Sequence, residues 1–303
     1  MLRTRPAASS AAIPPDAVIE LLKPVTWFAA MWAFACGTIA ASTPGEGFPW
    51  IRMLAGMVLA GPLVCGASQA TNDWFDRHVD AINQPERPIP SGRLPGRSGL
   101  VIAIAMSGFA LLYAAALGRL VFVAALLALA LGWAYSAPPL RLKTDGIWGP
   151  GVTGLAYEGL AWITGALVAG GGAALHRPLM VSLAVLYSLG ALGIMTLNDF
   201  KAVEGDKRLG IRSLPVRWGS PAAARAACWI MAVPQLVVIV LVAGQGMTIR
   251  ATIIAALLIG QIALMPRLIR DPEGQAKWYS GFGVTLYVAG MMVAAFGIRG
   301  MAT

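Results

Sequence analysis

Three aspartates, Asp73, Asp76 and Asp80, lie in the stretch NDWFDRHVDAINQPERPIPSGR, which begins at Asn72. Their i, i+3 and i+7 spacing puts all three carboxylates on one face of a helix. Like charges at this spacing destabilise a helix unless cations offset them. One interpretation is a solvated helix end whose acids pair with neighbouring bases such as Arg77. The other is a site for a hard divalent ion, because oxygen ligands without His or Cys favour Mg²⁺.

A second acidic stretch, NDFKAVEGDKRLGIRSLPV, begins at Asn198. Asp199 and Asp206 are seven residues apart and share a helix face, whereas Glu204 needs a bend at Gly205 to join them. Like the first stretch, this one starts with Asn-Asp and an aromatic residue nearby, and continues to Arg-x-x-Pro. The repetition predicts an internal duplication in which two halves each present one acidic loop to a shared mouth.

The chain that must position these acids is strongly apolar, with 303 residues, 57% hydrophobic and 12% charged, and a mean hydropathy of +0.70. Its apolar runs match the length of about 17 to 25 residues that crosses a bilayer. Nine such spans are predicted: 25–43, 53–71, 99–117, 120–136, 151–170, 179–197, 222–243, 249–265 and 280–298. The third and fourth are divided by Gly118 and Arg119 alone, so a tight hairpin is expected there. The fold class is therefore all-α, a polytopic bundle of nine transmembrane helices with two pseudo-repeated halves.

Lysine and arginine predict the orientation of the bundle. Of 23 basic residues, 17 lie in the N-terminal segment and in the loops after spans 2, 4, 6 and 8, against 5 on the opposite side. By the positive-inside rule the N-terminus and both acidic loops are cytoplasmic, and the C-terminus lies outside. We predict a short cytoplasmic tail, residues 1–24, and one domain, residues 25–303, with acidic loops 72–98 and 198–221. Residues 1–20 contain no apolar stretch of a signal peptide.

The net charge of +9 does not predict a nucleic-acid partner. The bases are spread over short loops between spans, where the lipid bilayer and its anionic headgroups account for them. Cys36, Cys65 and Cys228 fall in or beside spans without metal-ligand spacing, so we interpret them as packing residues.

Two acidic loops, flanked by bases and next to lipid, suit a substrate with a diphosphate head and a long hydrocarbon tail. Metal ions and fixed cations stabilise the diphosphate as it leaves an allylic carbon, and no enzyme nucleophile is needed. Further polar contacts to the substrates are predicted from both asparagines and from the bases and tyrosine near the loops: Asn72, Arg87, Tyr135, Arg141, Lys143, Asn198, Lys201 and Arg212. Glu158 lies within the fifth span, and a carboxylate at that depth is a candidate contact to the acceptor.

The quoted stretches, together with YSAPPLRLK and LLKPVTWF, resemble the UbiA superfamily of intramembrane prenyltransferases, and most closely its chlorophyll and bacteriochlorophyll synthase branch. The resemblance covers nearly the whole chain. It implies Mg²⁺-dependent transfer of a geranylgeranyl or phytyl group to the propionate carboxylate of a chlorophyllide. The short N-terminal tail, which does not resemble a plastid transit peptide, favours an enzyme of a bacterial inner membrane and bacteriochlorophyllide as the acceptor. The resemblance implies metal ligands among Asp73, Asp76, Asp80, Asp199, Glu204 and Asp206. Association with other pigment-biosynthesis or photosynthetic membrane proteins is compatible with this family.

Other functions stay open at this point. Chlorophyllide, a quinone precursor and haem are alternative acceptors for the same chemistry. An ion transporter also uses intramembrane acids and internal repeats, but its carboxylates are expected near the bilayer midplane rather than at one edge. A structural pigment-binding protein is a third class, and it needs axial ligands such as histidines within its spans. The two histidines of the chain, His78 and His176, lie in or near loops.

Overall fold

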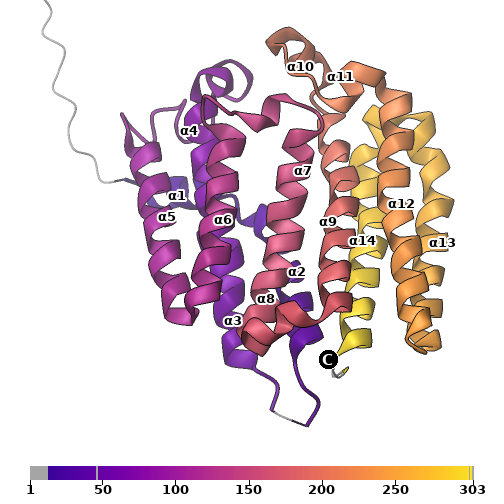
Figure 1. The fold of residues 1–303 in the computed structure, drawn as a ribbon. Helices are drawn as coiled ribbons and strands as arrows, with labels where there is room; N and C mark the ends of the chain where they lie inside the picture. Colours follow the sequence, from indigo (N-terminus) through magenta and orange to yellow (C-terminus); the bar gives the residue numbers. More distant parts are fainter. Residues whose placement is uncertain (1–12, 46, 300, 302–303) are drawn as a thin grey trace, which may run out of the picture.

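The computed structural model describes residues 13–45, 47–299 and 301, and within them the chain forms helices and loops without a β-strand (Figure 1). The first half of the predicted N-terminal tail, residues 1–12, lies outside the described residues. One isolated parallel bridge joins Asp145 to Arg212 in two loops.

Nine segments of the described chain are long and apolar enough to cross a membrane, which confirms the predicted number. Spans 1, 2 and 5 are each built from several consecutive helices: α1 (Pro15–Leu22), η1 (Pro24–Thr26) and α2 (Trp27–Ala41); α3 (Trp50–Val58), η2 (Leu59–Cys65) and α4 (Gly66–Asn83); α7 (Trp148–Gly154), η4 (Leu155–Leu160), α8 (Ala161–Gly170) and η5 (Gly171–His176). The other six are single helices: α5 (Ser98–Leu117), α6 (Arg119–Ser136), α9 (Pro178–Asp199), α12 (Ser220–Gly244), α13 (Thr248–Arg270) and α14 (Pro272–Ile298). Short helices η3 (Leu142–Thr144), α10 (Val203–Leu209) and α11 (Leu214–Trp218) lie in the loops.

The first span begins earlier than its apolar run indicates. Residues 15–22 form the helix α1, which buries Ala17 and Leu21 against Ala70 of α4. The described half of the predicted tail is therefore packed against the helix that carries the first acidic stretch.

The hairpin between spans 3 and 4 is as tight as predicted. Gly118 alone separates α5 from α6, with a φ of 144° that side-chain-bearing residues rarely adopt.

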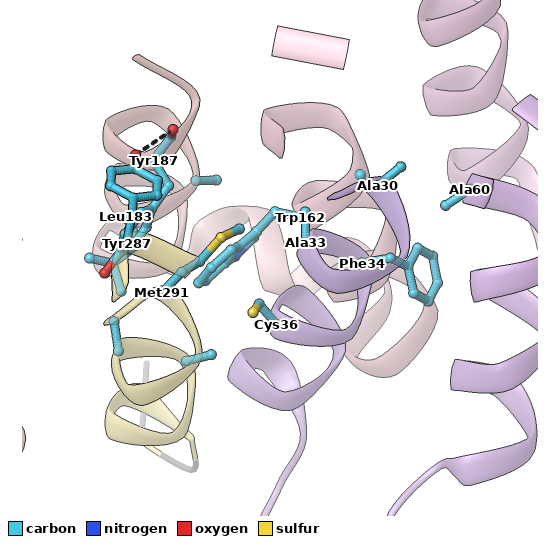
Figure 2. Close-up of a cluster of buried hydrophobic side chains, with 14 of the residues drawn as sticks. Ala30, Ala33, Phe34, Cys36, Ala60, Trp162, Leu183, Tyr187, Tyr287 and Met291 are labelled. Carbon is cyan, nitrogen blue, oxygen red and sulfur yellow. Dashed lines mark hydrogen bonds between the residues drawn. The ribbon is translucent and has the colours of Figure 1, made fainter. Parts of the chain in front are cut away.

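Spans 1, 5, 6 and 9 meet in a core of aromatic and small residues (Figure 2). Trp162 of α8 stacks on Tyr187 of α9 with ring centroids 6.0 Å apart, and Tyr287 of α14 donates a hydrogen bond of 2.8 Å to the Tyr187 carbonyl. A Cβ on Gly37 of α2 would overlap the Trp162 carbonyl oxygen. Small residues at such crossings let helix backbones approach closely in membranes. This core holds α9, which carries the second acidic stretch, against α2 and α8.

The ends of α4 and α9 that carry the acidic stretches lie at the same end of the bundle as α10, α11 and the connection from α6 to α7 (Figure 1). The C-terminal end of α14 lies at the opposite end. All loops predicted to hold the site therefore lie at one end of the bundle. This agrees with the prediction that the N-terminal segment and the loops after spans 2, 4, 6 and 8 share one side. The two-repeat relationship stays a prediction.

Candidate active site

The first acidic stretch is helical, as its spacing requires, because α4 continues to Asn83. Each of its aspartates contacts a base. Lys23 Nζ lies 2.5 Å from Asp73 Oδ1, and Arg87 Nη1 lies 2.7 Å from Asp80 Oδ2 and 3.5 Å from Asp73 Oδ1. Asp73 and Asp80 are buried. The three like charges on one face are thus offset by cations of the protein itself.

Asp76 is contacted by the loop between α6 and α7. Lys143 Nζ lies 2.6 Å from Asp76 Oδ1, in ion-pair contact but without hydrogen-bond geometry, and Arg141 Nη2 donates to the same oxygen at 3.3 Å. Burial lowers the pKa of Lys143, an effect that the adjacent Asp76 opposes. Arg141 has a φ of 40°, a conformation uncommon for a non-glycine residue and found at functional sites.

The second acidic stretch differs in its partners. Asn198 and Asp199 end α9, and Asp206 lies on α10. Within the described part of the chain, neither Asp199 nor Asp206 forms an ion pair. Burial raises the pKa of Asp206, as expected for a carboxylate that loses water without gaining a neighbouring cation.

Both stretches face one cavity of about 410 Å³, which we call the mouth. Eleven of the predicted site residues line it: Asn72, Asp76, Asp80, Arg87, Tyr135, Arg141, Lys143, Asn198, Asp199, Lys201 and Asp206. Two segments that lie 126 residues apart in the sequence therefore contribute carboxylates to the same space.

The loops around the mouth are joined to each other by backbone hydrogen bonds. Gly146 N donates to the Arg212 carbonyl at 2.9 Å, and Arg212 N donates to the Thr144 carbonyl at 3.0 Å. Asp145 accepts from the backbone N–H groups of Ile147 and Trp148, and these donors lower its pKa. The base-bearing loop and the second acidic loop are thereby held in one arrangement.

Four predicted site residues do not line the mouth. Asp73 is turned to Lys23 and Arg87 and is 3% exposed. The Glu204 side chain is 75% exposed and contacts Lys207, because the bend predicted at Gly205 does not form and residues 203–209 continue as one helix. The Arg212 side chain is 73% exposed and reaches toward Asp145, so this residue contributes its backbone instead.

Glu158 is the fourth. It is buried in η4, its Oε2 atom has no hydrogen-bond partner among the described residues, and it lines neither the mouth nor the chamber below it. The prediction for Glu158 rested on its depth in the span alone; η4 is a π-helix, whose extra residue shifts the faces of the segments on either side. The preceding residue, Tyr157, takes the cavity-facing position instead.

Below the mouth lies a second cavity of about 440 Å³, the inner chamber. It adjoins the mouth, with which it shares six wall residues: Asn72, Tyr135, Thr153, Met195, Asn198 and Lys201. The rest of its wall is mostly apolar and includes Val25, Phe28 and Ile194, with Gln69 and Tyr157 among the polar exceptions. No motif in the sequence points to Gln69 or Tyr157 as cavity residues; for Lys23, which contacts Asp73, its position within LLKPVTWF is the available signal.

No three His, Cys, Asp or Glu side chains in residues 13–45 and 47–299 converge closely enough to hold a metal ion by themselves. Mg²⁺ does not require this, because it keeps waters and commonly binds one or two carboxylates together with substrate phosphates. Four carboxylates dispersed around the mouth, two of them without an ion pair in the described chain, fit that mode of binding.

The nine spans among the described residues and the polar mouth at one edge are those of a membrane protein with a site that opens at the edge of its helical bundle. The chain belongs to the UbiA prenyltransferase family, whose model matches residues 26–296, and it is an integral membrane protein. This confirms the resemblance seen in the sequence.

Comparison with individual proteins narrows the branch. The chain is 54% identical to the bacteriochlorophyll synthase 33 kDa chain of Cereibacter sphaeroides, over 95% of this chain and 94% of that one. It is 34% identical to the chloroplastic chlorophyll synthase of Arabidopsis thaliana, over 91% of this chain and 73% of that one. A solved structure of a UbiA homolog from Archaeoglobus fulgidus, bound to GPP and Mg²⁺, has the same fold, with a TM-score of 0.70, 21% identity and coverage of 94% of this chain and all of that one.

Proposed function

We propose that this protein transfers a geranylgeranyl or phytyl group from its diphosphate to the propionate carboxylate of bacteriochlorophyllide, forming an ester. The observation that carries the proposal is a pair of adjoining cavities, a mouth lined by both acidic stretches and a mostly apolar inner chamber below it. Higher identity to bacteriochlorophyll synthases than to chlorophyll synthases supports the acceptor.

The mouth suits a diphosphate held with Mg²⁺. Arg87, Arg141, Lys143 and Lys201 line it and supply positive charge to the phosphate oxygens. Asp76, Asp80, Asp199 and Asp206 are the carboxylates in position to hold Mg²⁺, a cofactor that neutralises charge on the leaving diphosphate when bound. The structural relative from Archaeoglobus fulgidus binds Mg²⁺ together with GPP, which supports this assignment.

The reaction breaks the allylic C–O bond and forms a bond from the acceptor carboxylate oxygen to the same carbon, with diphosphate as the leaving group. Because the propionate is ionised near neutral pH, no general base is required. The bases of the mouth stabilise the leaving group as its charge develops. The apolar wall of the inner chamber excludes water from the allylic carbon, which protects the developing cation.

Both substrates are largely apolar and can reach the site from the bilayer. We place the mouth at the cytoplasmic face of a bacterial inner membrane. The excess of basic residues in the loops around the mouth supports this orientation.

Mass spectrometry of the product tests the proposal. Purified protein receives geranylgeranyl or phytyl diphosphate, Mg²⁺ and one acceptor at a time: bacteriochlorophyllide, chlorophyllide or 4-hydroxybenzoate. We expect the bacteriochlorophyllide ester to form at the highest rate. A faster reaction with chlorophyllide would move the protein to the chlorophyll branch, and a product from the benzoate alone would overturn the proposal.

A further inference from the structure

A groove on the outside of the bundle runs between span 5 and α9, which lie side by side (Figure 1). It has a volume of about 450 Å³, and its lining is apolar apart from Ser188 and the indole N–H of Trp148. Leu155, Val185 and Leu189 on its rims are about half exposed, so the groove opens to the surroundings of the bundle. It shares no wall residue with the mouth. We call it the outer groove.

Small residues form the floor of the outer groove. A Cβ on Gly159 would lie 3.0 Å from Ser188 Oγ, so the two backbones approach closely there. A Cβ on Gly151 would meet only Leu192 Cδ1, at 3.8 Å, so the floor is open at that position. From Val181 to Leu192 the groove extends roughly 16 Å along α9 at 1.5 Å per residue. This is about the thickness of one leaflet of a bilayer with about 30 Å of hydrocarbon, so the groove fits an acyl chain.

Two arginines lie at the end of the outer groove that is nearest the loops. Ile147 and Trp148 line this end, and their backbone N–H groups donate to Asp145 Oδ1 at 2.9 and 3.1 Å. The other oxygen, Asp145 Oδ2, lies 3.7 Å from Arg217 Nη1 and 3.9 Å from Arg212 Nη2. Both distances exceed the range of about 2.7 to 3.2 Å for an N–H···O hydrogen bond. Two guanidinium groups therefore share one carboxylate and keep donors for another anion.

This combination matches a phospholipid. The guanidinium fork binds phosphate oxygens well, and the arginines lie at the end of the bundle where headgroups are expected. Trp148 and Trp218, 66% and 50% exposed, flank the same place, as aromatic residues do at a membrane interface. A free phosphate would leave the groove unused, and a helix of another protein would supply no phosphate. Two cations beside one carboxylate favour an anionic headgroup over a zwitterionic one.

We propose that the outer groove, together with Arg212 and Arg217, binds one anionic phospholipid, with an acyl chain in the groove and the phosphate at the two guanidinium groups. The site lies outside the mouth and goes beyond the proposed function. It also gives a role to the Arg212 side chain, which does not line the mouth. Asp145 belongs to the loop that carries Arg141 and Lys143, so the bound lipid is expected to stabilise that loop.

Native mass spectrometry of the delipidated protein in detergent tests the inference. Phosphatidylglycerol and phosphatidylcholine with the same acyl chains are titrated separately, and we expect phosphatidylglycerol to bind about 10-fold more tightly. The double variant Arg212→Gln with Arg217→Gln is expected to lose this preference, because each base near an anionic headgroup contributes a several-fold gain. Gly151→Leu fills the floor of the groove and is expected to weaken both lipids about 10-fold. Val185→Trp, at an exposed rim position, replaces it if the leucine variant does not fold.

The matched control is Arg97→Gln with Arg270→Gln, which removes two exposed arginines from other loops of the same side. It is expected to keep phosphatidylglycerol binding within about 2-fold of the unmodified protein. Equal phosphatidylglycerol affinity in the control and in the Arg212 and Arg217 variant overturns the inference, as does unchanged binding when the groove is filled. Glycerol phosphate is titrated as well, and binding as tight as that of the lipid would make the site one for a soluble phosphate. None of these measurements depends on turnover, so they stand or fall apart from the proposed function.

Discussion

The two acidic stretches around the mouth have opposite electrostatic surroundings. On α4, Asp73, Asp76 and Asp80 are each in contact with at least one lysine or arginine. On α9 and α10, Asp199 and Asp206 face the same cavity without an ion pair among the described residues. The two stretches are similar in sequence, but the ion pairs that their aspartates form are not.

This difference suggests a division of labour. The first stretch binds and orders the bases that a diphosphate needs, so its charge is largely balanced before a substrate arrives. The second stretch presents two carboxylates to the cavity without an ion pair among the described residues, and a partly buried carboxylate without an ion pair is costly unless a cation binds it. We infer that the second stretch contributes more than the first to Mg²⁺ affinity. The first stretch contributes more than the second to the position of the bound diphosphate.

The largest expected effect comes from Asp199→Asn. Removing this unpaired carboxylate is expected to lower turnover about 100-fold or more, the range seen when one charge-stabilising group is lost from an active site. It is also expected to raise the Mg²⁺ concentration for half-maximal activity. Initial rates measured over a Mg²⁺ series, after removal of metal with a chelator, give both quantities.

Asp76→Asn is the matched variant on the first stretch. It leaves Lys143 and Arg141 without their carboxylate, so the mouth becomes more positive. We expect a smaller change in Mg²⁺ requirement than for Asp199→Asn and a lower KM for the diphosphate. Equal shifts in Mg²⁺ requirement for the two variants would remove the proposed division of labour.

Asp73→Asn tests whether the buried aspartate positions bases rather than binding metal. We expect turnover to fall about 10-fold, equivalent to about 1.4 kcal/mol, with an unchanged Mg²⁺ requirement. Loss of the contacts to Lys23 and Arg87, each 23% exposed, is expected to cost about 2 kcal/mol of stability, less than for a fully buried pair. Thermal unfolding in detergent measures this, and a raised Mg²⁺ requirement would instead make Asp73 a ligand.

A smaller effect on turnover is expected from changing the backbone hydrogen bonds between Arg212 and residues 144 and 146, which join the base-bearing loop to the second acidic loop. A Cβ at Gly146 would lie 2.6 Å from the Arg212 carbonyl oxygen and from Leu214 N, so Gly146→Ala must displace backbone. The expected cost is about 1 to 3 kcal/mol of stability, with a loss of activity because both loops move. Gly244→Ala, where a Cβ meets nothing within 4 Å, is the control. Equal thermal stability of the two variants would contradict a structural role for the bridge.

Much of this arrangement was predictable from the sequence because it depends on local pattern. The apolar runs predicted nine spans, and the i, i+3, i+7 spacing of the α4 aspartates predicted their shared helix. The burial of Asp73 away from the mouth was not predictable from the sequence. Its partner Lys23 lies 50 residues away and is brought near because α1 packs on α4. The position of Glu158 outside both cavities was not predictable, because a π-helical turn leaves no clear mark in the sequence.

The smallest effect is expected from Glu204, the residue whose metal-binding role the structure does not support. Its side chain is 75% exposed and contacts the exposed Lys207, and such surface pairs contribute about 0 to 1 kcal/mol. Glu204→Gln is therefore expected to keep both turnover and Mg²⁺ requirement within about 2-fold of the unmodified protein. The same Mg²⁺ series used for Asp199→Asn provides the measurement, because both residues belong to the second stretch. A large increase in Mg²⁺ requirement for Glu204→Gln would mean that α10 rearranges when substrate binds, and that Glu204 joins Asp199 and Asp206 at the metal.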